Sequence, residues 1–248
     1  GKGSELIDKL ENLSYDGKKI TINYYDTSGN IIDKPDYSVD SNITAEGIIN
    51  RYINLIGGKD NLEDVQSIEL KGSADLDMQG QNFKLEFYSL KNNQNQSLST
   101  VSAGGMQVQK SVFNKDQGYN VVNGQKIILS EGELEQALTD SKLFSELSYD
   151  YEIVKLVGSS TIDDQKVYEI KISDNNTEYY SIETGLKVKE VENQLIDGNQ
   201  ITIETTIKEY QEVNGILIPS EINQVTPAVP IPGGITIKFN TIELNVES

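Results

Sequence analysis

From Ser67 onward, apolar and polar residues alternate with a period of two, and this pattern limits the folds open to the chain. Ile68, Leu70, Ala74 and Leu76 share one face of the first such segment. Short polar turns separate the segments, and Asn123-Gly124 is the clearest of these turns because the pair favours a two-residue hairpin. Strands joined this closely run antiparallel, since parallel strands need longer crossovers.

The pattern predicts strands from Ser67 to near the end of the chain, with few interruptions in the second half. We expect them near residues 67–76, 83–87, 98–101, 106–113, 119–122, 127–129, 152–158, 166–172, 178–182, 186–192, 200–210, 216–224 and 235–246. Helices are few. One is predicted over 44–56, a short turn near Leu62 and Val65, and a third behind the capping-box pattern Ser130-Glu131-Gly132-Glu133.

The dry faces of so many strands must be buried against something. A second sheet, closure into a barrel, or a curved sheet wrapped over helices would each do this. The predicted fold class is mainly β (α+β): a strongly curved antiparallel sheet or half-barrel with a few helices on its concave side. The helix at 44–56 presents one apolar stripe, comprising Ile48, Ile49, Tyr52, Ile53 and Ile56, which we expect to lie against that side.

The sequence divides into three parts. Residues 1–35 are expected to form a helix, with Leu6, Ile7, Leu10 and Leu13 at helical spacing, followed by a strand. The polar stretch 36–43 is expected to be a linker, and 44–248 the β domain. The chain starts Gly1-Lys2-Gly3 with no hydrophobic leader, so we expect an excised or processed piece whose export signal lies elsewhere.

Composition excludes several classes of function. The 39 acidic and 21 basic residues give a net charge of −18, which disfavours nucleic acid and anionic membrane surfaces as partners. The chain has neither histidine nor cysteine, so catalytic triads and His- or Cys-ligated metal sites cannot form. No apolar run approaches the ~20 residues of a membrane span. We therefore expect no enzyme activity, no cofactor and no bound metal.

Several polar patterns have an ordinary structural interpretation. Asp75 and Asp77 are spaced as a carboxylate pair for acid–base work or calcium, but in a chain this acidic they are typical of a solvated strand face. The cluster 174–178 lacks the glycine and ligand spacing of a calcium loop. An enzyme that uses carboxylates alone is therefore the least favoured hypothesis for the function of this chain.

Read as a whole, the chain resembles the β-rich C-terminal domain of certain bacterial insulinase-type zinc peptidases, and the N-terminal piece resembles the last helix and strand of the peptidase unit. The segments that carry the resemblance are 45–53, 56–59, 62–68, 102–106, 178–180, 183–188, 210–219 and, nearer the start, Tyr24-Tyr25-Asp26, Gly29-Asn30 and Lys34-Pro35. The HxxEH zinc motif of that family is absent, so no catalytic role transfers to any residue here.

That domain in turn resembles the LolA-like lipoprotein-carrier half-barrel. The resemblance implies a non-catalytic binding or accessory domain in the periplasm or at the outer membrane, attached to upstream peptidase domains. The alternative is a free-standing carrier of lipids or lipoproteins that holds acyl chains in the half-barrel.

The expected ligand is apolar, either an acyl chain or an extended peptide. Because helices are few, part of the concave face is predicted to remain open as a binding site. The residues predicted to line it are Phe83, Leu85 and Phe87, then Ile201 and Ile203, then Ile235, Ile237 and Phe239. The proline-rich loop 226–234 contributes Val229 and Ile231 at the rim or as a lid. A fully packed core with a rigid loop is the competing hypothesis.

Overall fold

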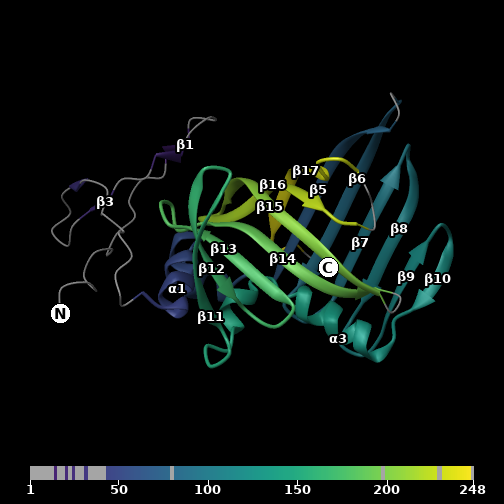
Figure 1. The fold of residues 1–248 in the computed structure, drawn as a ribbon. Helices are drawn as coiled ribbons and strands as arrows, with labels where there is room; N and C mark the ends of the chain where they lie inside the picture. The colour runs from purple at the N-terminus through teal and green to yellow at the C-terminus, as the bar shows by residue number, and fades with distance from the viewer. Residues whose placement is uncertain are drawn as a thin grey trace.

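A single antiparallel sheet of 13 strands dominates the computed structural model (Figure 1). The structure describes residues 43–78, 81–196, 199–227 and 231–246, together with two small strand pairs nearer the N-terminus. These pairs are β1 (Ser14–Tyr15) with β2 (Ile20–Thr21), and β3 (Tyr24–Tyr25) with β4 (Ile31–Ile32). The predicted helix around Leu6–Leu13 and the linker 36–42 lie outside the described residues.

The sheet consists of two meanders that meet in its middle. One runs through β5 (Ser67–Met78), β6 (Gln81–Asn92), β7 (Ser97–Ala103), β8 (Met106–Phe113), β9 (Gly118–Val122) and β10 (Gln125–Ile128). The other runs through β11 (Lys155–Ile162), β12 (Gln165–Lys171), β13 (Asn176–Ser181), β14 (Lys187–Ile196), β15 (Asn199–Val213), β16 (Ile216–Val225) and β17 (Ile235–Leu244). Strands β5 and β17 pair and join the two halves, so β10 and β11 form the outer edges.

Helix α1 (Ala45–Leu55) packs against the concave side of the sheet and contributes buried residues to the core. The Thr44 hydroxyl accepts a hydrogen bond from the Gly47 N–H at 3.1 Å and caps the helix. The five residues of the predicted stripe are all buried. At its end, Gly57 and Gly58 adopt positive φ, and the Ile56 carbonyl accepts from the N–H of Leu217 in β16. These contacts confirm the predicted helix and the side it covers.

The connection from β10 to β11 carries an α-helix and a 3₁₀ helix across the sheet. Helix α3 (Glu131–Asp140) begins with the predicted capping box, and the 3₁₀ helix η1 (Ser145–Ser148) follows it. The short helix α2 (Lys59–Glu63) follows α1. Since the connection starts at one edge strand and ends at the other, it passes over the concave side (Figure 1).

The fold class predicted from sequence is therefore confirmed: a curved antiparallel sheet with few helices. One strand boundary was predicted wrongly, and one short helix was not predicted. Residues 151–153 form a turn, so β11 starts only at Lys155 and not at the predicted residue 152. The 3₁₀ helix η1 was not predicted. Both differences lie in the connection that crosses the sheet, where packing against α1 and β13 replaces the alternation that marks a strand.

Candidate functional site

The concave face brings together residues from both halves of the sheet. Directly paired residues of antiparallel strands lie on the same face. On this basis Phe83, Leu85 and Phe87 of β6 lie beside Leu76, Ala74 and Gly72 of β5, the side that packs against α1. Phe239 of β17 pairs with Gly72 from the other side. Gly72 thus separates two phenylalanine side chains, and a Cβ there would lie 2.5 Å from the Lys238 carbonyl oxygen.

The predicted isoleucines continue the same surface. Ile235 and Ile237 of β17 pair with Gln224 and Ile222 of β16. Ile201 and Ile203 lie on the concave face of β15, directly beside Gln194 and Glu192 of β14. The sheet therefore places on one face the eight strand residues predicted to line a binding site. Ile231 is half-buried in the loop between β16 and β17, whereas Val229 lies outside the described residues.

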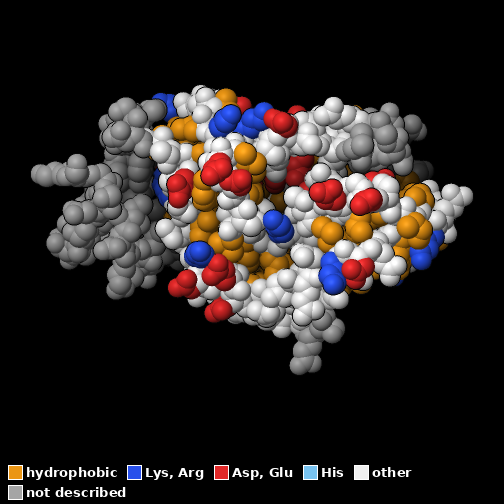
Figure 2. Space-filling model, turned by 90° about the horizontal axis from the view of Figure 1, so that it is seen from below, with side chains coloured by type: hydrophobic (Ala, Val, Ile, Leu, Met, Phe, Trp, Pro, Cys, Tyr) orange, Lys and Arg blue, Asp and Glu red, His pale blue; other side chains and the backbone are white. Residues whose placement is uncertain are grey.

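Burial differs sharply between the two ends of this face. Around α1, Ile49, Ile170 and Tyr180 are completely buried. Among the predicted lining residues in strands, only Ile237 is buried, Phe83 is 43% exposed, and the others are half-buried. Hydrophobic side chains accordingly reach the surface in several places in Figure 2. Helix α1 fills one end of the half-barrel and leaves the other end partly uncovered.

A polar strip that sequence reasoning missed borders this apolar surface. The Asp140 side chain, at the end of α3, accepts hydrogen bonds from Gln136 at 2.7 Å and from Gln194 of β14 at 3.4 Å. Its backbone carbonyl accepts from the Lys91 ammonium of β6 at 3.0 Å. The end of α3 thus connects β6 to β14 across the concave side. No α3 residue is buried, and these hydrogen bonds join the end of the helix to the sheet.

Glu192 belongs to this strip and lies beside Ile203. Burial raises the pKa of its carboxyl group to about 7, and the negative charges of Glu190 and Asp140 add to the rise. The sequence did not predict that Glu192 is partly buried on the concave face. Glu190, Glu192 and Gln194 are polar, and the alternation of apolar and polar residues assigns polar positions to the solvent.

A buried ion network holds the closed end together. The Lys187 ammonium of β14 lies 2.7 Å from both the Glu146 carboxylate of η1 and the Glu178 carboxylate of β13. Glu178 also accepts hydrogen bonds from the hydroxyl groups of Tyr149 and Tyr180. Burial acts to lower the pKa of Lys187, but the nearby carboxylates outweigh it and raise that pKa well above its ordinary value.

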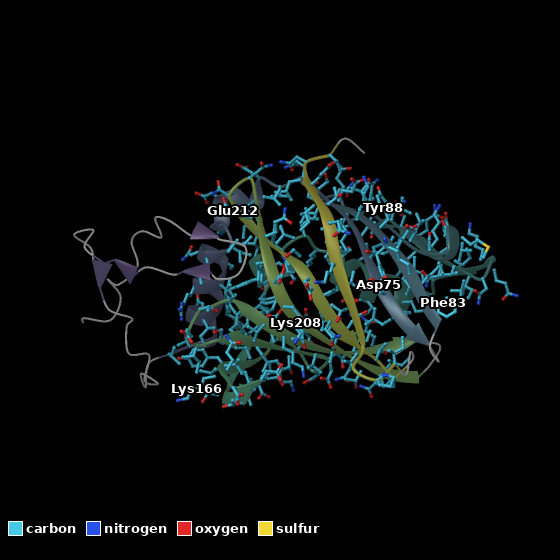
Figure 3. All side chains as sticks on the ribbon, turned by 90° about the horizontal axis from the view of Figure 1, so that it is seen from above. Asp75, Phe83, Tyr88, Lys166, Lys208 and Glu212 are labelled. Carbon is cyan, nitrogen blue, oxygen red and sulfur yellow. The ribbon has the colours of Figure 1, made fainter. Side chains whose placement is uncertain are left out.

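Of the acidic pair considered for chemistry, only the Asp75 side chain lies within the described residues. Asp75 is exposed on the outer face of β5 and pairs across the strands with Lys84 (Figure 3). Within the described residues, no group of three or more acidic side chains is arranged to hold a metal ion. No helix in that part of the chain is long and apolar enough to cross a bilayer.

Two solved structures share this architecture. A LolA superfamily protein from Nitrosomonas europaea aligns over 83% of this chain and 96% of its own, with 13% identity and a TM-score of 0.54. A DUF1329 family protein from Desulfovibrio piger aligns over 82% of this chain and 94% of its own, with 11% identity and a TM-score of 0.50. No family model and no curated protein matches the sequence. At these identities the likeness concerns the fold: the chain has a LolA-like half-barrel.

Proposed function

We propose that this protein is a non-catalytic carrier that holds an apolar ligand, such as an acyl chain or lipid, on the concave face of its half-barrel. The observation that carries the proposal is the row of half-buried apolar side chains in the middle of the sheet. Leu85, Phe87, Ile203 and Phe239 occupy central strands, yet neither α1 nor α3 covers them fully. Apolar surface left in a concavity is where small ligands bind.

The LolA-like fold supports a carrier over a peptidase accessory domain, because the similar structures described above include a LolA superfamily protein. Attachment to an insulinase-type peptidase remains a prediction from sequence resemblance. A location in the periplasm or at the outer membrane accompanies the carrier proposal and remains a prediction as well. The absence of histidine and cysteine supports the non-catalytic part.

Titration with N-phenyl-1-naphthylamine, an uncharged apolar fluorophore, tests the proposal. We expect saturable binding that Ile203→Glu weakens at least about tenfold, since a carboxylate would then enter the apolar surface. Val157→Glu is the matched control, because Val157 is 60% exposed on the edge strand β11. Retained circular dichroism shows that each variant folds.

Two results would count against a lipid carrier. Absence of binding to the fluorophore and to fatty acids at high micromolar concentration would leave a packed accessory domain. Binding of extended apolar peptides without binding of lipids would replace the acyl ligand with a peptide. Native mass spectrometry after mild extraction identifies any ligand that copurifies.

A further inference from the structure

An apolar row crosses the outer face of the sheet, on the side away from α1. Leu90 of β6 pairs with Leu98 of β7, and Leu98 pairs with Val112 of β8. Val112 pairs with Tyr119 of β9, which pairs with Ile128 of the edge strand β10. These five side chains therefore form one continuous line across five strands, about 19 Å long at ~4.8 Å per strand. This row is separate from the concave face, because it occupies the alternate positions of the same strands.

The row forms the floor of a groove of about 380 Å³. Volumes of this order are typical of small-molecule sites. Ile128, at the outer end of the row, is 65% exposed. Its side chain is therefore accessible to a ligand that lies in the groove.

The charge of the groove is opposite to that of the molecule. The whole chain carries 39 acidic residues, but none lines the groove, and Lys126 is the one charged residue that does. Its ammonium lies 4.0 Å from the centre of the Tyr119 ring, over the apolar floor. An apolar floor with a single cation at one end is complementary to an elongated apolar molecule that carries one negative charge.

We propose that this groove is a second binding site, distinct from the concave face, for a small anionic amphiphile such as an alkyl carboxylate. The alkyl chain lies along the row from Ile128 toward Leu90, and the carboxylate pairs with the Lys126 ammonium. A second copy of the chain is a poorer occupant, because each copy carries a net charge of −18 and the two would repel.

The probe is 11-(dansylamino)undecanoate, with its methyl ester as the uncharged comparison. Binding to the wild-type chain and to Ile203→Glu is measured by dansyl fluorescence. Lys126→Gln removes the cation and keeps a polar side chain, and Ile128→Glu places a carboxylate at an exposed end of the floor. Lys84→Gln is the matched control, because Lys84 is exposed on the same outer face of β6 and does not line the groove.

We expect Lys126→Gln to weaken binding of the acid about tenfold and to remove its preference over the ester. Ile128→Glu should weaken both probes, whereas Lys84→Gln should change neither. Binding of the acid should persist in Ile203→Glu, which separates this site from the concave one.

Three outcomes would overturn the inference. Affinity unchanged by both groove variants would show that the probe does not bind there. Complete loss of binding in Ile203→Glu would assign the probe to the concave face and leave the carrier proposal standing. Dimerisation that Ile128→Glu abolishes, without an effect on the probe, would make the groove a contact between copies.

Discussion

At the scale of single residues, Lys187 is the most consequential side chain of the closed end. Its single positive charge lies 2.7 Å from the carboxylates of both Glu146 and Glu178, which are buried. We expect Lys187→Met to lower the free energy of unfolding by about 3–5 kcal/mol at pH 7, because it leaves two buried carboxylates without a cation. Urea denaturation measures the change. Lys189→Met, which removes the more exposed pair with Glu204, should cost less than about 1 kcal/mol.

A triple variant separates the charge from the packing. Adding Glu146→Gln and Glu178→Gln to Lys187→Met removes the uncompensated charges and should restore much of the lost stability. If the triple variant is as unstable as the single one, the loss comes from packing of the lysine stem and not from the unpaired carboxylates.

Glu192 gives the molecule a pH dependence of definite sign. Its pKa is raised from 4.5 to about 7 on folding, so the folded state binds the proton more tightly than the unfolded state. The associated stability is fully present below pH 4.5 and is lost as the pH rises through 7. Glu192→Gln should therefore raise the free energy of unfolding by roughly 1–3 kcal/mol at pH 8 and by little near pH 4.

Urea denaturation at a series of pH values from 4 to 8 measures this difference. Glu209→Gln, at an exposed position of β15, is the control and should leave the profile unchanged. Parallel profiles for wild type and Glu192→Gln would mean that the carboxyl group titrates equally in both states.

At the scale of elements, α1 carries the predicted core stripe, and Ile53 is one of its buried members, 6% exposed. Ile53→Ala should lower the free energy of unfolding by roughly 2–5 kcal/mol, through lost burial and the cavity left behind. Chemical denaturation checks this value. A loss below about 0.5 kcal/mol would mean that the stripe does not support the sheet. Leu55 lies on the same helix but is only half-buried, so it provides the comparison. Leu55→Ala should lower the free energy of unfolding by less than Ile53→Ala does.

The elements that sequence predicted well are those with strong local signals. Thr44, Ser130-Glu133 and Asn123-Gly124 mark their cap or turn through chemistry confined to a few residues, and the structure has each of them. Alternation also placed Phe83, Leu85 and Phe87 on one face. The polar strip and the Lys187 network could not be predicted, because they join residues far apart in sequence. Glu146 and Lys187, for example, lie 41 positions apart.

At the scale of the whole molecule, the pairing of β5 with β17 holds the two meanders together. Residues 67–78 and 235–244 lie far apart in the chain but side by side in the middle of the sheet. Closing such a long loop is costly in entropy, so these contacts form only with the complete fold. The two edge strands are more exposed than the middle of the sheet. Every residue of β10 is exposed, and so are most residues of β11.

This organisation predicts a gradient of stability across the sheet. Amide hydrogen exchange should be slowest in β5, β17 and the strands beneath α1, which open only with global unfolding. Exchange in β10 should be at least about a hundredfold faster, because an edge strand can open without disturbing the core. The measurement is exchange followed by mass spectrometry of peptides from each strand. Equal protection in β10 and β17 would mean that the sheet opens as one unit. Faster exchange in β17 than in β10 would mean that the two meanders separate at their junction before the edges open.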